Sequence, residues 1–250
     1  MSSNQYLASV IKKYQVDSGK AFTYYNFFLP QIQEWAGSDL RDVKISGSSA
    51  KGTAIRNGTD VDIFISITSA TAHTLGNIYE TLFNYMDAKG FKVRKQNVSL
   101  GITYNNDKID LVPARRIDQY GREHNLYVRK LGTWRQTNID AHISKVQGSN
   151  RINEIRLTKI WRDLNNLDFP SFYLELIVIE ALSGKLYNDL ANNFLTVLQY
   201  LASSFPSRLV IDPANSANRI SDLLSDSEKK KIASAAQVSL AKDTWQKIVW

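Results

Sequence analysis

Two aspartates, Asp60 and Asp62, are separated by a single residue in an alternating run of polar and apolar residues that ends at Ile65. This alternation predicts a β-strand, which places both carboxylates on one face with their Cα atoms about 6–7 Å apart. Two neighbouring acids repel each other, and a cation between them relieves the repulsion. Because no Cys or His lies near them in the sequence, the oxygen ligands favour Mg²⁺ or Mn²⁺ over zinc.

A Gly-Ser turn, Gly47-Ser48, precedes the aspartates and follows a short alternating run from Val43 to Ile45. Backbone N–H groups and a hydroxyl at such a turn can bind phosphate. Metal-assisted phosphoryl transfer needs a phosphate-binding turn opposite metal-binding acids. Each motif alone is short and more often structural, so the indication rests on their joint order and spacing.

The arrangement resembles the signature of the DNA polymerase β-like nucleotidyltransferase superfamily. That signature begins with an apolar residue, Gly, and then Gly or Ser. A spacer follows, here residues 49–59, and then come Asp, an apolar residue, and Asp or Glu. The superfamily also needs a third carboxylate on a later strand. Asp110, inside the apolar run from Lys108 to Ala114, is identified with it, although a single Asp in a strand is otherwise structural or an edge device.

Three stretches nearer the C-terminus extend the resemblance to bacterial cGAS/DncV-like nucleotidyltransferases, 2′-5′-oligoadenylate synthases and archaeal CCA-adding enzymes. The first is Asn138 to His142, in which Ile139 replaces the usual Pro. The second is Arg156 to Glu175, which includes the Lys-x-Trp and Ser-Phe-x-Leu-Glu motifs. The third is Ile211 to Asn218. The match covers roughly residues 20–240.

The resemblance also implies roles for single residues in this C-terminal half. It places Lys159 and Ser171 on the donor triphosphate, where the alternatives are a snorkelling lysine and a helix cap. His142 is implied to contact phosphate or to cap and pack a helix. Glu175 and Asp212 are expected to be structural.

Composition indicates an ordinary globular protein: the 250 residues are 43% hydrophobic and 22% charged. The absence of Cys excludes disulfides, a Cys-based zinc finger and a thiol nucleophile. The net charge of +7 favours polyanionic partners such as nucleotides or RNA. Since we find no signal peptide and no apolar run of membrane-spanning length, we expect a cytoplasmic protein without membrane contact.

The predicted fold is α+β. We expect a nucleotidyltransferase lobe with a mixed sheet over residues 1–137, packed against an all-α lobe over residues 138–250, with the active-site cleft between them. Helices are expected at 5–17, 20–36 with an interruption at Pro30, 73–89, 150–165, 171–187, 188–203 and within 221–249, and strands at 43–45, 60–65, 91–96, 98–104 and from Lys108 to an end at Pro113. The basic residues of 114–136 are expected to be a solvated surface or the rim of an anion site.

The implied activity is transfer of NMP from an NTP, ATP or GTP, to a nucleotide hydroxyl with release of pyrophosphate. Asp60, Asp62 and Asp110 would hold two Mg²⁺ ions, while Gly47 and Ser48 would hold the β- and γ-phosphates. The compact chain favours synthesis of a linear or cyclic oligonucleotide second messenger in bacterial anti-phage defence, with a defence effector acting on the product.

Three alternatives remain at the level of sequence. One is an RNA-terminal nucleotidyltransferase of the CCA-adding or poly(A) type, with RNA as its partner, and another transfers AMP to a protein. The third is a nucleotide sensor without chemistry, which the presence of all three acids argues against. No motif determines the base preference or the linkage of the product.

Overall fold

The computed structural model describes residues 1–17, 19–56 and 60–250. Its contacts divide the chain into two compact units. The sheet unit contains Asp17–Lys51 and Thr59–Ile143, and the helical unit contains Met1–Val16, Gly52–Gly58 and Ser144–Trp250. The first helix, α1 (Ser3–Lys13), belongs to the helical unit although it opens the chain. The units therefore do not follow the chain order assumed in the division between residues 137 and 138.

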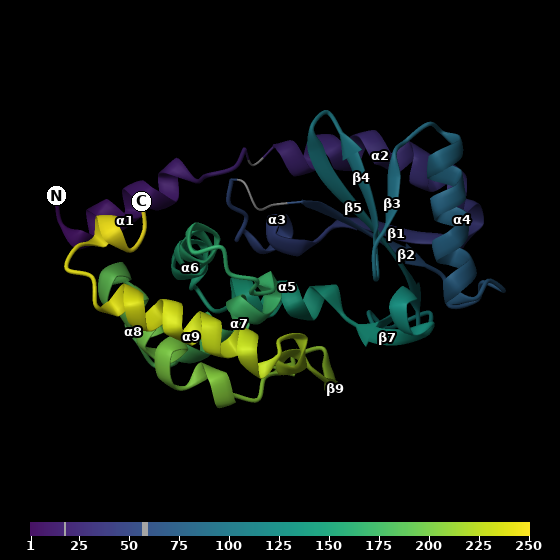
Figure 1. Cartoon of the computed structure of the whole chain (residues 1–250). Helices are drawn as coiled ribbons and strands as arrows, with labels where there is room; N and C mark the ends of the chain where they lie inside the picture. The colour runs from purple at the N-terminus through teal and green to yellow at the C-terminus, as the bar shows by residue number, and fades with distance from the viewer. Residues whose placement is uncertain (18, 57–59) are drawn as a thin grey trace. The chain divides into compact units, whose positions relative to one another are not determined.

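The sheet unit is built on a mixed sheet (Figure 1). Its strands are β1 (Leu40–Ile45), β2 (Val61–Ile67), β3 (Val93–Lys95), β4 (Leu100–Tyr104), β5 (Asp107–Arg116), β6 (His124–Val128) and β7 (Thr133–Thr137). They run in the order β1-β2-β5-β4-β3, with β6 joining β5 and β7 joining β6. The pair β2–β5 is parallel and the other pairs are antiparallel, which confirms the predicted mixed sheet.

Two helices cover one face of this sheet. The helix α2 (Lys20–Ala36) packs on β1 and β2, and α4 (Leu75–Ala88) packs on β3, β5 and β6. The core between them and the sheet includes Phe28, Ile32, Ile63, Ile65, Tyr79, Leu82, Met86, Ile109 and Leu111, all fully buried. Because side chains alternate along a strand, the residues between these apolar positions, including Asp62 and Asp110, lie on the opposite face.

Two predictions about prolines were wrong. The helix α2 continues through Pro30 to Ala36, and β5 continues through Pro113 to Arg116. Proline has no backbone N–H and is tolerated in a strand only where a ladder bond is absent. On one side of β5, β4 pairs as far as Leu111 and β6 begins at Ala114, so Pro113 falls in the gap between the two partners.

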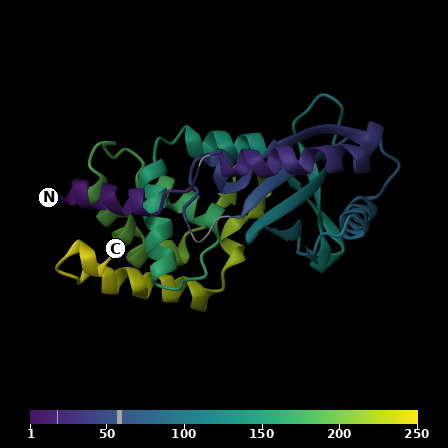
Figure 2. The ribbon, with the colours of Figure 1, turned by 90° about the horizontal axis from the view of Figure 1, so that it is seen from above.

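The helical unit contains α1, α6 (Ile152–Leu164), α7 (Ser171–Ala181), α8 (Leu190–Ser203) and α9 (Asp226–Leu240). The helix α5 (Ile139–Gln147) begins in the sheet unit and ends in the helical unit. Both chain termini lie side by side in the helical unit (Figures 1 and 2), where Tyr6 Oη donates to Val249 O at 2.9 Å and Tyr14 Oη donates to Trp250 O at 3.1 Å. No helix of the described residues is both long enough and apolar enough to cross a membrane.

A small two-stranded sheet corrects the expectation of an all-α second lobe. Here β8 (Ile211–Asp212) pairs with β9 (Asn215–Arg219). Buried Asp212 accepts hydrogen bonds from Ala214 N and Asn218 Nδ2, both at 2.8 Å, and these bonds close the turn. Asp212 thus has the structural role that we expected.

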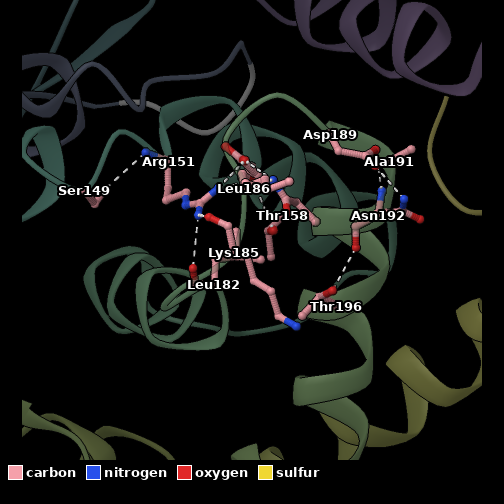
Figure 3. A network of polar contacts seen from close by, with 12 residues as sticks. Ser149, Arg151, Thr158, Leu182, Lys185, Leu186, Asp189, Ala191, Asn192 and Thr196 are labelled. Atoms are coloured by element: carbon pink, nitrogen blue, oxygen red, sulfur yellow. Dashed lines mark hydrogen bonds and ion pairs between the residues drawn. The ribbon is translucent and has the colours of Figure 1, made fainter.

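Arg151, just before α6, holds the C-terminal end of α7 (Figure 3). Its guanidinium is buried and donates to Leu186 O at 3.0 Å, to Leu182 O at 3.1 Å and to Lys185 O. Carbonyls that follow the end of a helix need such donors when they are buried. The helix α7 ends at Ala181, six residues before the predicted end at residue 187, and Arg151 binds carbonyls that follow this end.

Candidate active site

Two of the predicted acids are direct neighbours in the sheet. Asp62 on β2 is the register partner of Asp110 on the parallel strand β5. Strands that share hydrogen bonds lie about 4.8 Å apart, and register partners point to the same face. Asp60 immediately precedes β2, and its charge affects the ionisation of Asp110. The structure therefore brings together the acids that the sequence had separated by about fifty residues.

Asp110 is held by neutral donors. Gln96 Nε2 donates to its Oδ1 at 2.7 Å, and Ser99 Oγ donates to its Oδ2 at 3.2 Å. Burial raises the pKa of Asp110, and the charge of Asp60 raises it further, against the opposing effects of Ser99, Gln96 and Arg94. The contribution of Asp60, second to that of burial, indicates that the two carboxylates repel each other.

Gly47 lies against the carboxylate of Asp62. Its φ is +59°, and a Cβ at this position would come within 1.7 Å of Asp62 Oδ2. The neighbouring Ser46 N donates to Asp62 O at 2.8 Å, which ties the turn to β2. Gly47 begins the short helix α3 (Gly47–Lys51), in which Ser48 is half-buried. A glycine is required here by both the backbone conformation and the space beside Asp62.

Lys159, predicted to bind triphosphate, is 2% exposed and lies in the interior of the helical unit. Its Nζ is 2.7 Å from Glu175 Oε1 and 3.0 Å from Thr53 Oγ1, and the Thr53 hydroxyl donates to the same Glu175 oxygen at 2.6 Å. A buried ammonium needs such a carboxylate partner. Glu175 is thus structural, as expected, whereas a phosphate contact of Lys159 stays a prediction.

Ser171 and His142 also have protein neighbours. Ser171 is the first residue of α7, and its hydroxyl accepts a hydrogen bond from Arg162 Nη1 at 2.9 Å. His142 lies in α5, partly buried, and its backbone N donates to Asn138 O at 3.2 Å. The phosphate contacts that the resemblance implies for both residues stay predictions.

Arg156 is a candidate that the sequence analysis did not single out. It lies on α6 one turn before Lys159, and its buried Nε has no hydrogen-bond partner among the described residues. Burial lowers its pKa, because it penalises the charged guanidinium. A partly buried cation with an unused donor favours an anionic ligand. In the sequence, the signal for Arg156 was its place at the start of the stretch Arg156 to Glu175, three residues before Lys159.

The donor set fits a hard divalent cation in its chemistry. Asp60, Asp62 and Asp110 offer only oxygen ligands, which Mg²⁺ prefers, and the crowding of negative charge favours a cation. No group of three or more His, Cys, Asp or Glu side chains in the described ranges is arranged so that it could hold a metal ion as it stands. Binding would therefore require these carboxylates to turn towards a common point.

No protein-family model matches the chain. A cyclic AMP-AMP-AMP synthase of Escherichia coli strain MS 115-1 is 26% identical over 204 residues, which span 72% of this chain and 63% of that relative. The match thus covers less than two thirds of the relative's length.

Two solved structures share the fold. The complex of E. coli MS115-1 CdnC with HORMA-deltaN has a TM-score of 0.79 at 20% identity, covering 98% of this chain and 96% of that one. The Cid1 poly(U) polymerase bound to MgATP has a TM-score of 0.68 at 13% identity, covering 95% of this chain and 93% of that one. These similarities confirm the predicted α+β fold class.

Proposed function

We propose that this chain, which has the fold of the polymerase β-like nucleotidyltransferases, is a metal-dependent nucleotidyltransferase. It would move a nucleoside monophosphate from an NTP to a nucleotide hydroxyl. The acceptor oxygen bonds to the α-phosphorus, the bond to pyrophosphate breaks, and the hydroxyl proton leaves to solvent. The observation that carries the proposal is the register pairing of Asp62 with Asp110, with Gly47 packed against the Asp62 carboxylate.

Asp60, Asp62 and Asp110 would hold Mg²⁺, with Mn²⁺ as an alternative. A divalent cation supplies charge stabilisation to the transferring phosphoryl group and lowers the pKa of a bound hydroxyl. Cid1, which shares the fold, is a protein whose structure contains MgATP. Burial raises the pKa of Asp110 and the charge of Asp60 raises it further, and a bound cation would relieve that repulsion.

The chain's own residues would bind and orient the substrates. Gly47 and Ser48 would contribute a backbone N–H and a hydroxyl to the β- and γ-phosphates. The close approach of Gly47 to Asp62 supports this assignment, because it puts the proposed phosphate-binding turn beside a proposed metal ligand. Positioning of this kind carries most of the rate in phosphoryl transfer.

Further contacts to the donor triphosphate are assigned by resemblance to Lys159, Ser171 and His142. We add Arg156, because its buried Nε is unpaired among the described residues whereas Lys159 is paired with Glu175. Arg156 and Lys159 can be distinguished by substitution. Loss of NTP affinity in Arg156→Gln with a normal melting temperature would support a direct phosphate contact.

We further propose that the product is a linear or cyclic oligonucleotide second messenger used in bacterial anti-phage defence. The support is the similarity to the cyclic AMP-AMP-AMP synthase, a synthase of a cyclic oligonucleotide by its name. ATP or GTP would be the substrate, and a defence effector would respond to the product. The proposal places the protein in the cytoplasm, where NTPs are available.

The test is incubation of the pure protein with Mg²⁺ or Mn²⁺ and labelled NTP mixtures, followed by mass spectrometry of the products. We expect release of pyrophosphate and a small oligonucleotide. Absence of both across metals, pH values and nucleic-acid or protein activators would contradict the proposal.

A second candidate is an RNA-terminal nucleotidyltransferase. Two observations favour it: the fold shared with the Cid1 poly(U) polymerase, and six basic residues between residues 115 and 135. Labelled tRNA and oligo(A) in the same assay separate the two candidates. Extension of the RNA without small products would favour the polymerase.

A further inference from the structure

A chain of hydrogen bonds fixes the side chain of Arg116 at the end of β5. His124 Nδ1 lies 2.8 Å from Arg122 O, an acceptor, so Nδ1 carries the proton. In the neutral ring, Nε2 is then an acceptor and receives the hydroxyl proton of Ser66 at 2.8 Å. Ser66 Oγ in turn accepts from Arg116 Nε at 3.1 Å. Each donor in this hydrogen-bond network therefore has one acceptor, and the network anchors the guanidinium of Arg116 at its Nε.

This series of hydrogen bonds lies on the face of the sheet that carries the acids. Ser66 follows Asp62 by four residues on β2, so both point to one face about 13 Å apart. Arg116 is the register partner of His124 and also lies on this face. Its neighbour Arg115 points to the opposite face, where its Nη1 donates to His73 O at 3.1 Å.

Among the described residues no carboxylate forms a close ion pair with Arg116: the nearby Asp118 accepts from Gly121 N and Tyr120 N, and these bonds, with the charge of Arg116, lower its pKa. Lys44 and Arg122 both lie 3.4 Å from Asp140 Oδ2, and His124 stays neutral because burial lowers its pKa. The two terminal nitrogens of Arg116 make no hydrogen bond or ion pair with the part of the chain that the structure describes. The residue as a whole is half-buried, so part of it is exposed to solvent.

We propose that Arg116, oriented by Ser66 and His124, binds a 5′-phosphate of the acceptor nucleotide. The inference rests on the proposed function, in which the acceptor presents its hydroxyl at the acids. The 5′-phosphate of that molecule then lies on the far side of its sugar from the reacting hydroxyl. The Arg116 guanidinium is bonded to Ser66, which is about 13 Å from Asp62 along the same face, so it lies beyond the acids, and its two parallel N–H groups match two phosphate oxygens. Ser66 and His124 are positioning residues.

The test is calorimetric binding of AMP and adenosine to the full chain in metal-free buffer. A charge-assisted hydrogen-bond pair is worth about 10- to 100-fold in affinity. We expect Arg116→Gln to weaken AMP binding by that factor and to leave adenosine binding unchanged. Arg115→Gln, one residue away on the other face, should bind both ligands as the parent does.

Ser66→Ala tests the positioning role. It should weaken AMP binding without affecting adenosine, a selectivity that general destabilisation would not produce, and melting temperatures report on folding. Equal AMP affinity in the parent and Arg116→Gln, including no binding by either, overturns the inference. The inference is also overturned if Arg116→Gln loses guanosine binding and GMP binding to the same extent, because the arginine would then contact the base.

The proposed function has a separate readout. A parent protein that forms oligonucleotides but shows no Arg116-dependent binding of AMP contradicts only the assignment of Arg116. A protein that binds AMP through Arg116 but releases no pyrophosphate from any NTP contradicts the proposed function instead.

Discussion

Replacing Gly47 with Ala should abolish most turnover while the protein still folds. The added Cβ would lie 1.7 Å from Asp62 Oδ2 and 2.5 Å from its Cγ. Ordinary van der Waals contact begins at 3.4 Å, so the carboxylate must move by roughly 1–2 Å. A misplacement of about 1 Å in a phosphoryl-transfer site can reduce the rate on the order of 10²-fold. We therefore expect at least that loss in pyrophosphate release.

The loss of stability should be smaller than the loss of activity. Alanine at a φ of +59° costs about 1–2 kcal/mol, against a total stability of about 5–15 kcal/mol. Gly132→Ala is the matched control, because Gly132 has a φ of +61° and nothing within 4 Å of the added Cβ. It introduces the same backbone strain without the clash.

The assay measures initial rates of pyrophosphate release with Mg²⁺ and saturating NTP, together with urea unfolding of each variant. We expect Gly132→Ala to lose stability but keep its rate, and Gly47→Ala to lose both. Equal rates in the two variants would refute the argument that Gly47 makes room for the Asp62 carboxylate.

Three further predictions concern buried charged and titratable groups. Because burial and Asp60 raise the pKa of Asp110, its ionisation destabilises the fold as pH rises above 3.8, the pKa of the unfolded state. Asp110→Asn should therefore raise the melting temperature at neutral pH in metal-free buffer, and this gain should vanish below pH 3.8. Lys159→Met leaves Glu175 buried without its cation and should cost about 3–5 kcal/mol in urea unfolding, most of which a second change, Glu175→Leu, should restore. The pKa of His124 is lowered from 6.5 by burial, so stability should fall as pH drops below 6.5, and His124→Gln should remove this dependence in thermal melts.

Local sequence signals predicted much of the sheet unit. Alternation located the strand that carries Asp62. It also located the strands at 98–104 and from Lys108, which Asn105 and Asn106, both with positive φ, connect. These features depend on neighbours in the chain, which is why sequence alone was sufficient. The same holds for α4, which lies within the predicted range 73–89, with Thr74 as its N-cap and Gly90, of positive φ, just beyond its end.

The features that the sequence did not predict depend on residues far apart in the chain. The strands β6 and β7 carry mixed polar and apolar residues. Their order comes from pairing instead, because β6 pairs with β5 and β7 pairs with β6. The buried pairing of Lys159 with Glu175 and Thr53 joins positions up to 106 residues apart. No local spacing distinguishes a lysine held in this way from one that contacts phosphate.

The central claim is that the three acids perform metal-dependent nucleotidyl transfer. The most direct test measures pyrophosphate release from Mg²⁺ and NTP by the parent, Asp60→Ala and Asp62→Ala, with melting temperatures confirming the fold. A metal contributes several kcal/mol to the transition state, and each ~1.4 kcal/mol is tenfold in rate. We predict a fall of about 10²-fold or more with unchanged or slightly higher melting temperatures in metal-free buffer. A folded Asp60→Ala protein with the parent's turnover would contradict the account.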